Sequence, residues 1–258
     1  MTLVDHVYGF YTRRLRSSVA DAGRLPAHVG LVMDGNRRWG RQMGLENPSL
    51  GHRVGAEHID DVLLWCERLG IKHVTAFVCS TENLTRRGDA EIAFLMQVIE
   101  DLVAERLTQQ TVTWQIHVAG MLDVLPSSTA RALKLAAERT RTCATGAHLT
   151  LAVGYGGRQD ILEAVRELLQ ERAEAGATPA DVARSLTTED IGRHLDTADR
   201  PDPDLIIRTS GEQRMSNFLL WQATGAELYF CETFWPAFRE LDFLRAVRTF
   251  AARKQRRL

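Results

Sequence analysis

Six short runs of mostly apolar, β-branched or aromatic residues constrain the fold of this chain more than any other feature. They are His28–Asp34, His73–Ser80, Trp114–Gly120, His148–Gly154, Asp204–Thr209 and Glu227–Cys231. Segments of helical length separate most of them, for example Gly55–Leu69, Asp89–Leu107, Ser127–Cys143 and Gln159–Ala173. This alternation predicts an α/β fold with one mainly parallel sheet covered by helices on both faces. We interpret Gly176–Asp190 and Asp196–Asp204 as surface connections around short helices.

Composition limits the class of protein. With 258 residues, 45% of them hydrophobic and 25% charged, the chain can bury a sizeable core. A formal net charge of −1 gives no general reason to expect nucleic acid as a partner. The cysteines are widely spaced without a CxxC pair, which argues against a disulfide framework or a zinc site. No apolar run approaches the ~18 residues of a membrane span and no signal peptide is evident, so we expect a cytoplasmic protein.

Residues 1–24 form a separate N-terminal helical segment in our interpretation. Its apolar residues recur at helical spacing and are interleaved with Arg13, Arg14 and Arg16; they are Val4, Val7, Tyr8, Tyr11, Leu15 and Val19. Two interpretations remain open. The helix either docks on its own domain, which we favour, or lies on the inner face of a membrane as an interfacial helix.

Polar segments follow four of the six predicted strands. In an open parallel sheet, ligands bind outside the carboxyl ends of the strands. The segments DGNRRW, STENLTR, GYGGR and RTSGEQRMSN should therefore meet at one edge and bring together Asp34, Asn36, Arg38, Asn83, Arg86, Arg158, Arg208 and Arg214. Guanidinium groups bind phosphate oxygens in a bidentate manner. The pattern predicts a pocket for a polyanion, and diphosphate is the natural ligand.

Individual residues in this predicted pocket have alternative explanations. Asp34 could bind Mg²⁺ together with substrate phosphates, or it could cap a helix. His52 could donate to a phosphate or serve a structural role at the start of a helix, and Trp39 is typical of a core residue. The chain has no Walker loop, GxSxG, HExxH or GxGxxG motif, so nucleotide-dependent phosphoryl transfer and triad hydrolysis have no motif support.

Four segments resemble, in order, the signature segments of the cis-prenyltransferases. They are HVGLVMDGNRRWGRQMG, CSTENLTR, GYGGRQDI and PDPDLIIRTSGEQRMSNFLLWQATGAELYF, and the resemblance runs from about Leu25 to Phe250. The similarity is greatest to the short-chain branch that makes Z,E-farnesyl diphosphate. It implies one α/β catalytic domain over residues 25–258 with a six-stranded, mainly parallel sheet, usually present as a homodimer.

The resemblance also implies a reaction. Isopentenyl diphosphate is condensed with a short allylic diphosphate, geranyl or dimethylallyl, with Mg²⁺ as cofactor and a new cis double bond in the product. A longer-chain polyprenyl diphosphate synthase and a non-catalytic accessory subunit of a heteromeric prenyltransferase remain alternatives.

Matching positions carry the implied roles. Asp34 would hold Mg²⁺ and assist departure of the allylic diphosphate, whose site is lined by Gly35, Asn36, Arg37, Arg38 and Trp39, with His52 as a further candidate. Asn83 would help to remove a proton from the isopentenyl unit, accompanied by Ser80, Thr81, Glu82 and Arg86. Arg208, Arg214 and Ser216 match the isopentenyl diphosphate site, and Glu227 matches a second Mg²⁺ ligand.

Three positions depart from the family pattern. Pro48 stands where the family usually has an arginine, four residues before His52, and Gln213 replaces a histidine. Many members also end in an Arg-x-Gly motif that reaches the partner subunit's site, whereas this sequence ends in Arg-Arg-Leu. The resemblance thus leaves open whether a partner subunit completes the site.

Product length is predicted from Val78. Longer-chain relatives tend to have alanine at the matching position, so valine here, together with Phe94, should narrow the hydrocarbon tunnel and favour a farnesyl-length product. The alternative is that Val78 is an ordinary strand residue that faces elsewhere.

Overall fold

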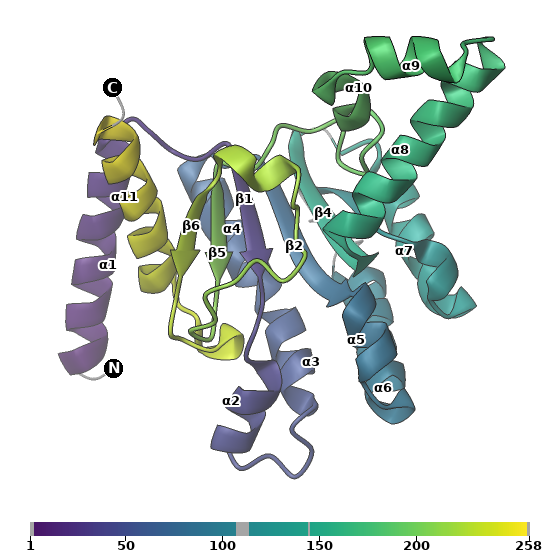
Figure 1. Ribbon diagram of the computed structural model, residues 1–258. Coiled ribbons are helices and arrows are strands. Elements are labelled where there is room, and N and C mark those ends of the chain that lie inside the picture. The colour runs from purple at the N-terminus through teal and green to yellow at the C-terminus, as the bar shows by residue number, and fades with distance from the viewer. Residues whose placement is uncertain (1–2, 107–113, 144, 257–258) are drawn as a thin grey trace.

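Six strands form one sheet in the computed structural model, which describes residues 3–106, 114–143 and 145–256 (Figure 1). The strands are β1 (His28–Val32), β2 (His73–Ser80), β3 (Trp114–Ala119), β4 (Ala147–Tyr155), β5 (Leu205–Arg208) and β6 (Glu227–Phe230), in the spatial order β3-β4-β2-β1-β5-β6. Every neighbouring pair is parallel. The predicted sheet is confirmed, and each strand begins and ends within two residues of its predicted limits.

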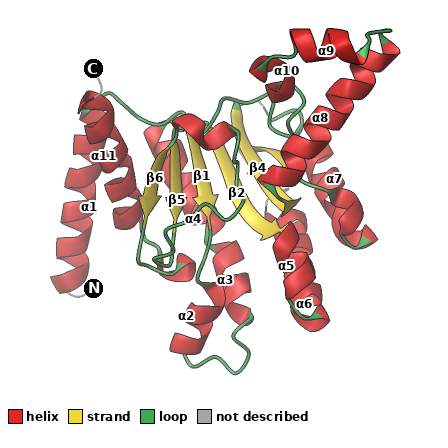
Figure 2. Cartoon of the chain, in the orientation of Figure 1, coloured by secondary structure: helices red, strands yellow, loops and turns green. Residues whose placement is uncertain are grey.

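Helices connect the strands and flank both faces of the sheet (Figure 2). They are α1 (Leu3–Asp21), α2 (Asn36–Gln42), α3 (Leu50–Glu57), α4 (Ile59–Leu69), α5 (Thr81–Arg86), α6 (Asp89–Asp101), α7 (Ser127–Thr140), α8 (Gly157–Glu174), α9 (Pro179–Ser185), α10 (Thr188–Gly192) and α11 (Glu240–Arg256). Short turns of 3₁₀ helix span Leu122–Val124, Gln222–Gly225 and Trp235–Ala237.

Two predicted helices differ from those observed. The segment predicted as one helix, Gly55–Leu69, belongs to α3 and α4, which are separated by a turn at the single residue His58. The segment predicted over Asp89–Leu107 is helix α6 followed by a π-helical turn over Leu102–Arg106. Leu107 itself lies outside the described residues.

The core lies between the sheet and its two helical layers. All five residues of β1 are buried, as expected for a central parallel strand with both faces covered. One face packs against apolar residues of α4, α6, α7 and α11, among them Leu63, Ile99, Leu133 and Leu244. The other face carries a smaller apolar cluster that includes Phe218. These two layers leave the carboxyl ends of the strands to be covered by loops and short helices.

Helix α1 docks against α11, and the two helices lie side by side (Figure 1). Leu15 and Val19 are buried in the main core. The guanidinium group of Arg16 donates to Glu240 on α11 at 2.9 Å through Nε and 2.5 Å through Nη2. The docked interpretation of the N-terminal helix therefore agrees with these contacts. Within the described residues, no helix is both long and apolar enough to span a membrane. The domain boundary after residue 24 stays a prediction.

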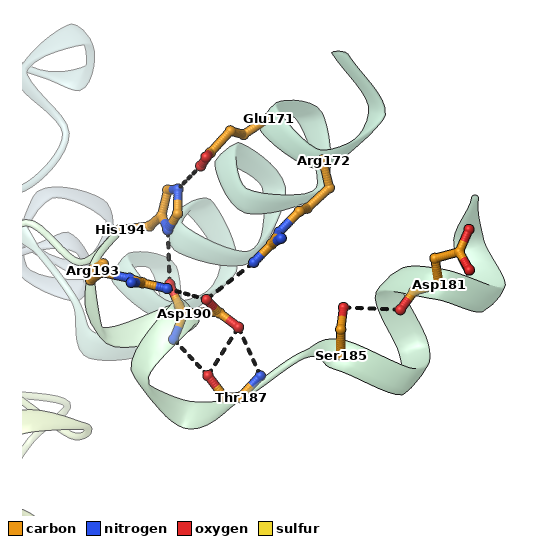
Figure 3. A network of polar contacts seen from close by, with 8 residues as sticks. All are labelled: Glu171, Arg172, Asp181, Ser185, Thr187, Asp190, Arg193 and His194. Atoms are coloured by element: carbon orange, nitrogen blue, oxygen red, sulfur yellow. Dashed lines mark hydrogen bonds and ion pairs between the residues drawn. The ribbon is translucent and has the colours of Figure 1, made fainter. Parts of the chain in front are cut away.

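Capping boxes build the short helices predicted around Gly176–Asp190. Thr187 precedes α10, and its backbone N–H donates to Asp190 Oδ2 at 3.0 Å while its hydroxyl group accepts from the Asp190 N–H at 3.2 Å. The same carboxylate accepts from Arg172 on α8 at 3.2 Å and pairs with Arg193 (Figure 3). Asp190 thus anchors α10 to α8.

Candidate active site

The candidate site lies where the strand order reverses. The chain passes from β1 to β2 on one side of β1, while β5 lies on its other side. In a parallel sheet, such a switch point leaves a crevice at the carboxyl ends of the strands. Asp34 follows β1 and Arg208 ends β5 at this crevice, and α2 and α5 begin at the same end of the sheet (Figure 1).

An ion pair joins the two central strands of this crevice. Arg208 Nη2 donates to Asp34 Oδ2 at 2.5 Å, and Arg208 Nη1 donates to Ser216 Oγ at 2.7 Å and to the Arg214 carbonyl group. The Arg208 side chain is only 4% exposed, whereas that of Asp34 is 40% exposed. Arg208 is therefore held rigidly, and the Asp34 carboxylate remains accessible to a ligand.

A polar cavity of about 550 Å³ opens beside this pair. Its lining is Val32, Asp34, Ser80, Glu82, Asn83, Arg86, Arg158, Arg208, Arg214, Ser216, Asn217 and Leu220. Four guanidinium groups face two carboxylates, so the lining carries a formal excess of two positive charges. The predicted convergence of the strand-end arginines is confirmed for Arg86, Arg158, Arg208 and Arg214. Such a cavity suits a small polyanion.

The loop after β5 is held in a strained conformation next to the cavity. Ser210, Ser216, Asn217 and Leu219 have φ values of 76°, 50°, 65° and 44°, a region that non-glycine residues rarely adopt. Asn217 helps to hold the loop, because its side-chain amide donates to Glu82 at 2.9 Å and accepts from the Arg158 N–H at 2.9 Å. Strain of this kind concentrates at functional sites.

Helix α5 places Asn83 and Glu82 at the cavity. The prediction treated this segment only as a strand end, but Ser80 caps a helix by accepting from the Asn83 N–H at 3.0 Å. Partial burial opposes ionisation of Glu82, yet hydrogen bonds from its own backbone and from Asn217, Ser80 and Thr81 lower the pKa of its carboxyl group. Glu82 is therefore an anchoring carboxylate rather than a proton donor.

Helix α2 positions the segment Gly35–Trp39. Gly35 has a φ of 103°, and a Cβ atom there would lie 2.7 Å from Phe234, so the sharp exit from β1 requires glycine. Arg38 Nη2 donates to Ser210 Oγ at 2.6 Å, and its guanidinium group lies 5.4 Å from the centre of the Phe234 ring. Arg38 and Trp39 line neither the polar cavity nor the apolar cavity described below.

A second cationic cluster surrounds His52 on α3. Arg87 Nη1 approaches His52 Nε2 at 3.4 Å, and both Arg37 and Arg87 form ion pairs with Glu91, at 2.8 and 3.1 Å. Burial, followed by the charges of Arg87 and Arg37, lowers the pKa of His52 to about 4. The imidazole is neutral at neutral pH. Although Pro48 removes the arginine expected before His52, two other arginines supply positive charge next to it.

An apolar cavity of about 50 Å³ runs between β2 and α6. Its polar end is formed by Asn36 and His52, and its walls include Ala76, Val78, Leu95, Val98, Ile99, Leu102 and Leu151. Val78 is the unpaired residue of a β-bulge, since β2 pairs with β4 through Phe77 and then Cys79. Val78 lines this apolar cavity, and its role on the wall of a hydrocarbon tunnel stays a prediction. Phe94 is half-buried and is not among the lining residues, so its predicted contribution is wrong.

Glu227 lies at the opposite end of the sheet from Asp34. It is paired with Leu205 at the start of β5, three residues or roughly 10 Å before the level of Arg208. Its carboxylate accepts from Arg253 on α11 at 2.8 Å. Within one chain, the structure therefore does not bring Glu227 and Asp34 to one metal ion. No group of three or more His, Cys, Asp or Glu residues in the described part of the chain is arranged to hold a metal.

Sequence reasoning missed Arg87, Glu91 and Asn217. Asn217 ends a segment that the strand-end rule had already selected, so it could have been found. Arg87 directly follows the selected Arg86, but nothing in the local sequence shows that it lies near His52, 35 positions earlier.

The chain is similar in sequence to known proteins over almost its whole length. A model of the undecaprenyl diphosphate synthase family matches residues 32–258. The chain is 64% identical over 257 residues to an isoprenyl transferase of Streptomyces fradiae, covering 99% of each chain. It is 47% identical over 250 residues to a (2Z,6E)-farnesyl diphosphate synthase of Thermobifida fusca, covering 97% of this chain and 96% of that protein. The crystal structure of lavandulyl diphosphate synthase from Lavandula x intermedia, in complex with dimethylallyl diphosphate, matches with a TM-score of 0.81 and 32% identity, covering 88% of this chain and 95% of that chain.

Proposed function

The chain belongs to the undecaprenyl diphosphate synthase family of prenyltransferases, and we propose that it condenses isopentenyl diphosphate with a short allylic diphosphate, geranyl or dimethylallyl, to make a short-chain Z-prenyl diphosphate. With geranyl diphosphate as primer, the product is Z,E-farnesyl diphosphate. One observation carries this proposal. A polar cavity rich in arginine and a separate apolar cavity both lie at the end of β1, where Val32 and Asp34 line the first and Met33 and Asn36 line the second, and this suits substrates that combine a diphosphate with a hydrocarbon. Relatives 44–47% identical are named farnesyl or short-chain Z-isoprenyl diphosphate synthases, which supports a short product.

The polar cavity is the proposed site for isopentenyl diphosphate. Arg208, Arg214 and Ser216 line it, together with Arg86. Guanidinium forks match diphosphate oxygens, and the rigid Arg208 gives the headgroup a defined position. Asn83 lies in the same cavity, where its side chain can orient the isopentenyl unit as that unit loses its proton.

The allylic substrate is proposed to bind with its diphosphate at Asp34–Trp39 and His52 and with its hydrocarbon in the apolar cavity. Asn36 and His52 belong to the polar end of that cavity, so a headgroup held there directs the chain between β2 and α6. Cleavage of the allylic C–O bond leaves negative charge on the departing diphosphate, and fixed positive groups stabilise that charge as it develops. The isopentenyl double bond then attacks the allylic carbon, and loss of a proton completes the new double bond.

Mg²⁺ is the proposed cofactor, and Asp34 is the residue that would hold it. This cation is often bound by one or two carboxylates together with substrate phosphates, which fits the accessible Asp34 carboxylate at the edge of an arginine-lined cavity. When bound, it would neutralise charge on the leaving diphosphate.

A homodimer and a cytoplasmic location are further proposals that rest on the resemblance and on composition. Light scattering should give twice the chain mass of 29.0 kDa if the dimer forms. Contact of α1 with the inner face of a membrane is proposed because Phe10 and Tyr11, 62% and 42% exposed, lie beside exposed Arg13 and Arg14. Co-sedimentation with anionic vesicles tests it, with Phe10→Ser and Tyr11→Ser as comparison variants.

One experiment tests the proposed reaction. The purified chain is incubated with isopentenyl diphosphate, Mg²⁺ and dimethylallyl, geranyl or farnesyl diphosphate in turn, and the products are identified by length and double-bond geometry. We expect a C15 product with one new cis bond from geranyl diphosphate. Products of many units would favour a longer-chain synthase. Absence of condensation with every primer would favour a non-catalytic accessory subunit.

A further inference from the structure

A carboxylate lies inside the cationic cluster at the polar end of the apolar cavity. Glu91 Oε2 is 2.8 Å from Arg37 Nη1, and Glu91 Oε1 is 3.1 Å from Arg87 Nη1. The Glu91 side chain is only 16% exposed. Two guanidinium groups from different elements, α2 and the segment between α5 and α6, therefore converge on one partly buried carboxylate.

The geometry of this cluster is that of an anion-binding subsite. Arg87 also approaches the neutral His52, whose ring lines the polar end of the apolar cavity. Arg37 Nε is buried and has no hydrogen-bond partner among the described residues, and the same holds for Asn36 Oδ1. Guanidinium groups oriented around one anion, with a donor left unused, can accept an anion with more oxygen atoms than a carboxylate has.

Glu91 has a simpler explanation as well. It lies in the first turn of α6, where an acidic side chain stabilises the helix, and it is four residues after Arg87. That explanation accounts for the pairing with Arg87. Stabilisation of α6 does not explain why Arg37, which is on α2 and 54 positions earlier in the sequence, also pairs with Glu91.

We propose that Glu91 is an internal counter-anion that occupies a diphosphate subsite formed by Arg37, Arg87 and His52, and that the allylic diphosphate displaces it on binding. Arg87 is thereby a binding residue for the allylic substrate, and Glu91 sets the affinity of the subsite by competing for its cations. The inference rests on the proposed function and refines its allylic site. Neither Arg37 nor Arg87 lines the polar cavity, so substitutions at Glu91 or Arg87 should leave the affinity for isopentenyl diphosphate unchanged.

Calorimetric titration of the full chain with dimethylallyl diphosphate alone, and separately with isopentenyl diphosphate alone, tests the proposal. Removing the competing charge in Glu91→Gln should tighten binding of dimethylallyl diphosphate roughly fivefold, because the ion pairs of Glu91 with Arg37 and Arg87, together worth about 1 kcal/mol, no longer compete with the ligand. Arg87→Gln should weaken it roughly tenfold, as expected for loss of one charge-assisted contact. Both variants should bind isopentenyl diphosphate as the unaltered chain does.

Asp89→Asn is the matched control. Asp89 is exposed in the same first turn of α6, so the variant removes the same charge without touching the cluster. Unchanged dimethylallyl diphosphate affinity in both cluster variants, with only a lower melting temperature, would show that Glu91 merely stabilises α6 and would overturn the inference. An equal gain in dimethylallyl diphosphate affinity in Asp89→Asn would also overturn the inference, since removal of any negative charge near the site would then explain the gain. Failure of the unaltered chain to bind either diphosphate would instead refute the proposed function.

Discussion

Truncating Val78 should lengthen the product. Val78 is half-buried at the bulge of β2 and lines an apolar cavity of about 50 Å³, in which Ile99 and Leu102 form the facing wall. Val78→Ala removes two methyl groups from the side of the cavity that β2 forms. Interiors are packed closely enough that space of this size matters to a growing hydrocarbon chain.

The magnitude follows from the hydrocarbon that the new space admits. Two further carbons buried at roughly 0.8 kcal/mol each give about 1.6 kcal/mol in favour of the longer chain. This corresponds to roughly a fifteenfold rise in the ratio of C20 to C15 product. The same truncation should cost the fold about 1 kcal/mol, because Val78 is only partly buried and the cavity already exists.

Product analysis by mass spectrometry, with geranyl diphosphate as primer and excess isopentenyl diphosphate, measures this ratio. Phe94→Ala is the control, since Phe94 is on the same helix as Ile99 but does not line the cavity. A C20 to C15 ratio that stays constant in an active, folded Val78→Ala variant would refute the reasoning, and another residue would then set the length. A comparable shift in Phe94→Ala would show that general loosening of α6 is responsible.

Three further predictions concern the polar cavity and the opposite end of the sheet. Asp34→Ala should abolish nearly all turnover, because the carboxylate acts on the leaving group, while the chain still folds with a lower melting temperature, because the buried Arg208 loses its ion-pair partner. Near-normal turnover with Mg²⁺ would contradict this role. Arg208→Ala and Arg214→Ala should raise the KM for isopentenyl diphosphate more than that for the allylic substrate in steady-state assays, and equal losses would mean that the two sites are wrongly divided. Burial lowers the pKa of His28 to about 4 from an ordinary 6.5, so the folded chain binds fewer protons than the unfolded chain between these values, and stability should fall as pH drops from 6.5 to 4. The free energy of unfolding, measured with urea, should be roughly 3 kcal/mol lower at pH 4 than at pH 6.5. His28→Gln should make this free energy depend less on pH, and parallel pH profiles for the variant and the unaltered chain would refute the role of His28.

The sequence alone determined the strands, their direction and most of the polar cavity. Buried parallel strands are continuous apolar runs, so β1 and its neighbours could be recognised locally. Because all strands are parallel, their carboxyl ends share one edge, and the residues after each strand had to converge there. This is why Asp34, Asn83, Arg208 and Arg214 could be placed together without knowing the strand order.

Only the tertiary structure decided what depends on register and on packing between distant segments. Glu227 begins β6, and the parallel register that aligns it with Leu205 places it at the end of the sheet away from Asp34. The break at His58 comes with packing of its ring against Trp65 and Trp235, which local helical periodicity does not reveal.

The lining of the apolar cavity and the cluster around His52 were likewise decided in three dimensions. Val78 faces the cavity and Phe94 does not, because the bulge in β2 and the rotation of α6 set which side chains point inward. Arg37, His52, Arg87 and Glu91 come from separate elements, and only the packing of α2, α3 and α6 brings their charges together. Local sequence patterns report the period of one element, whereas contacts between elements depend on how all of them share one core.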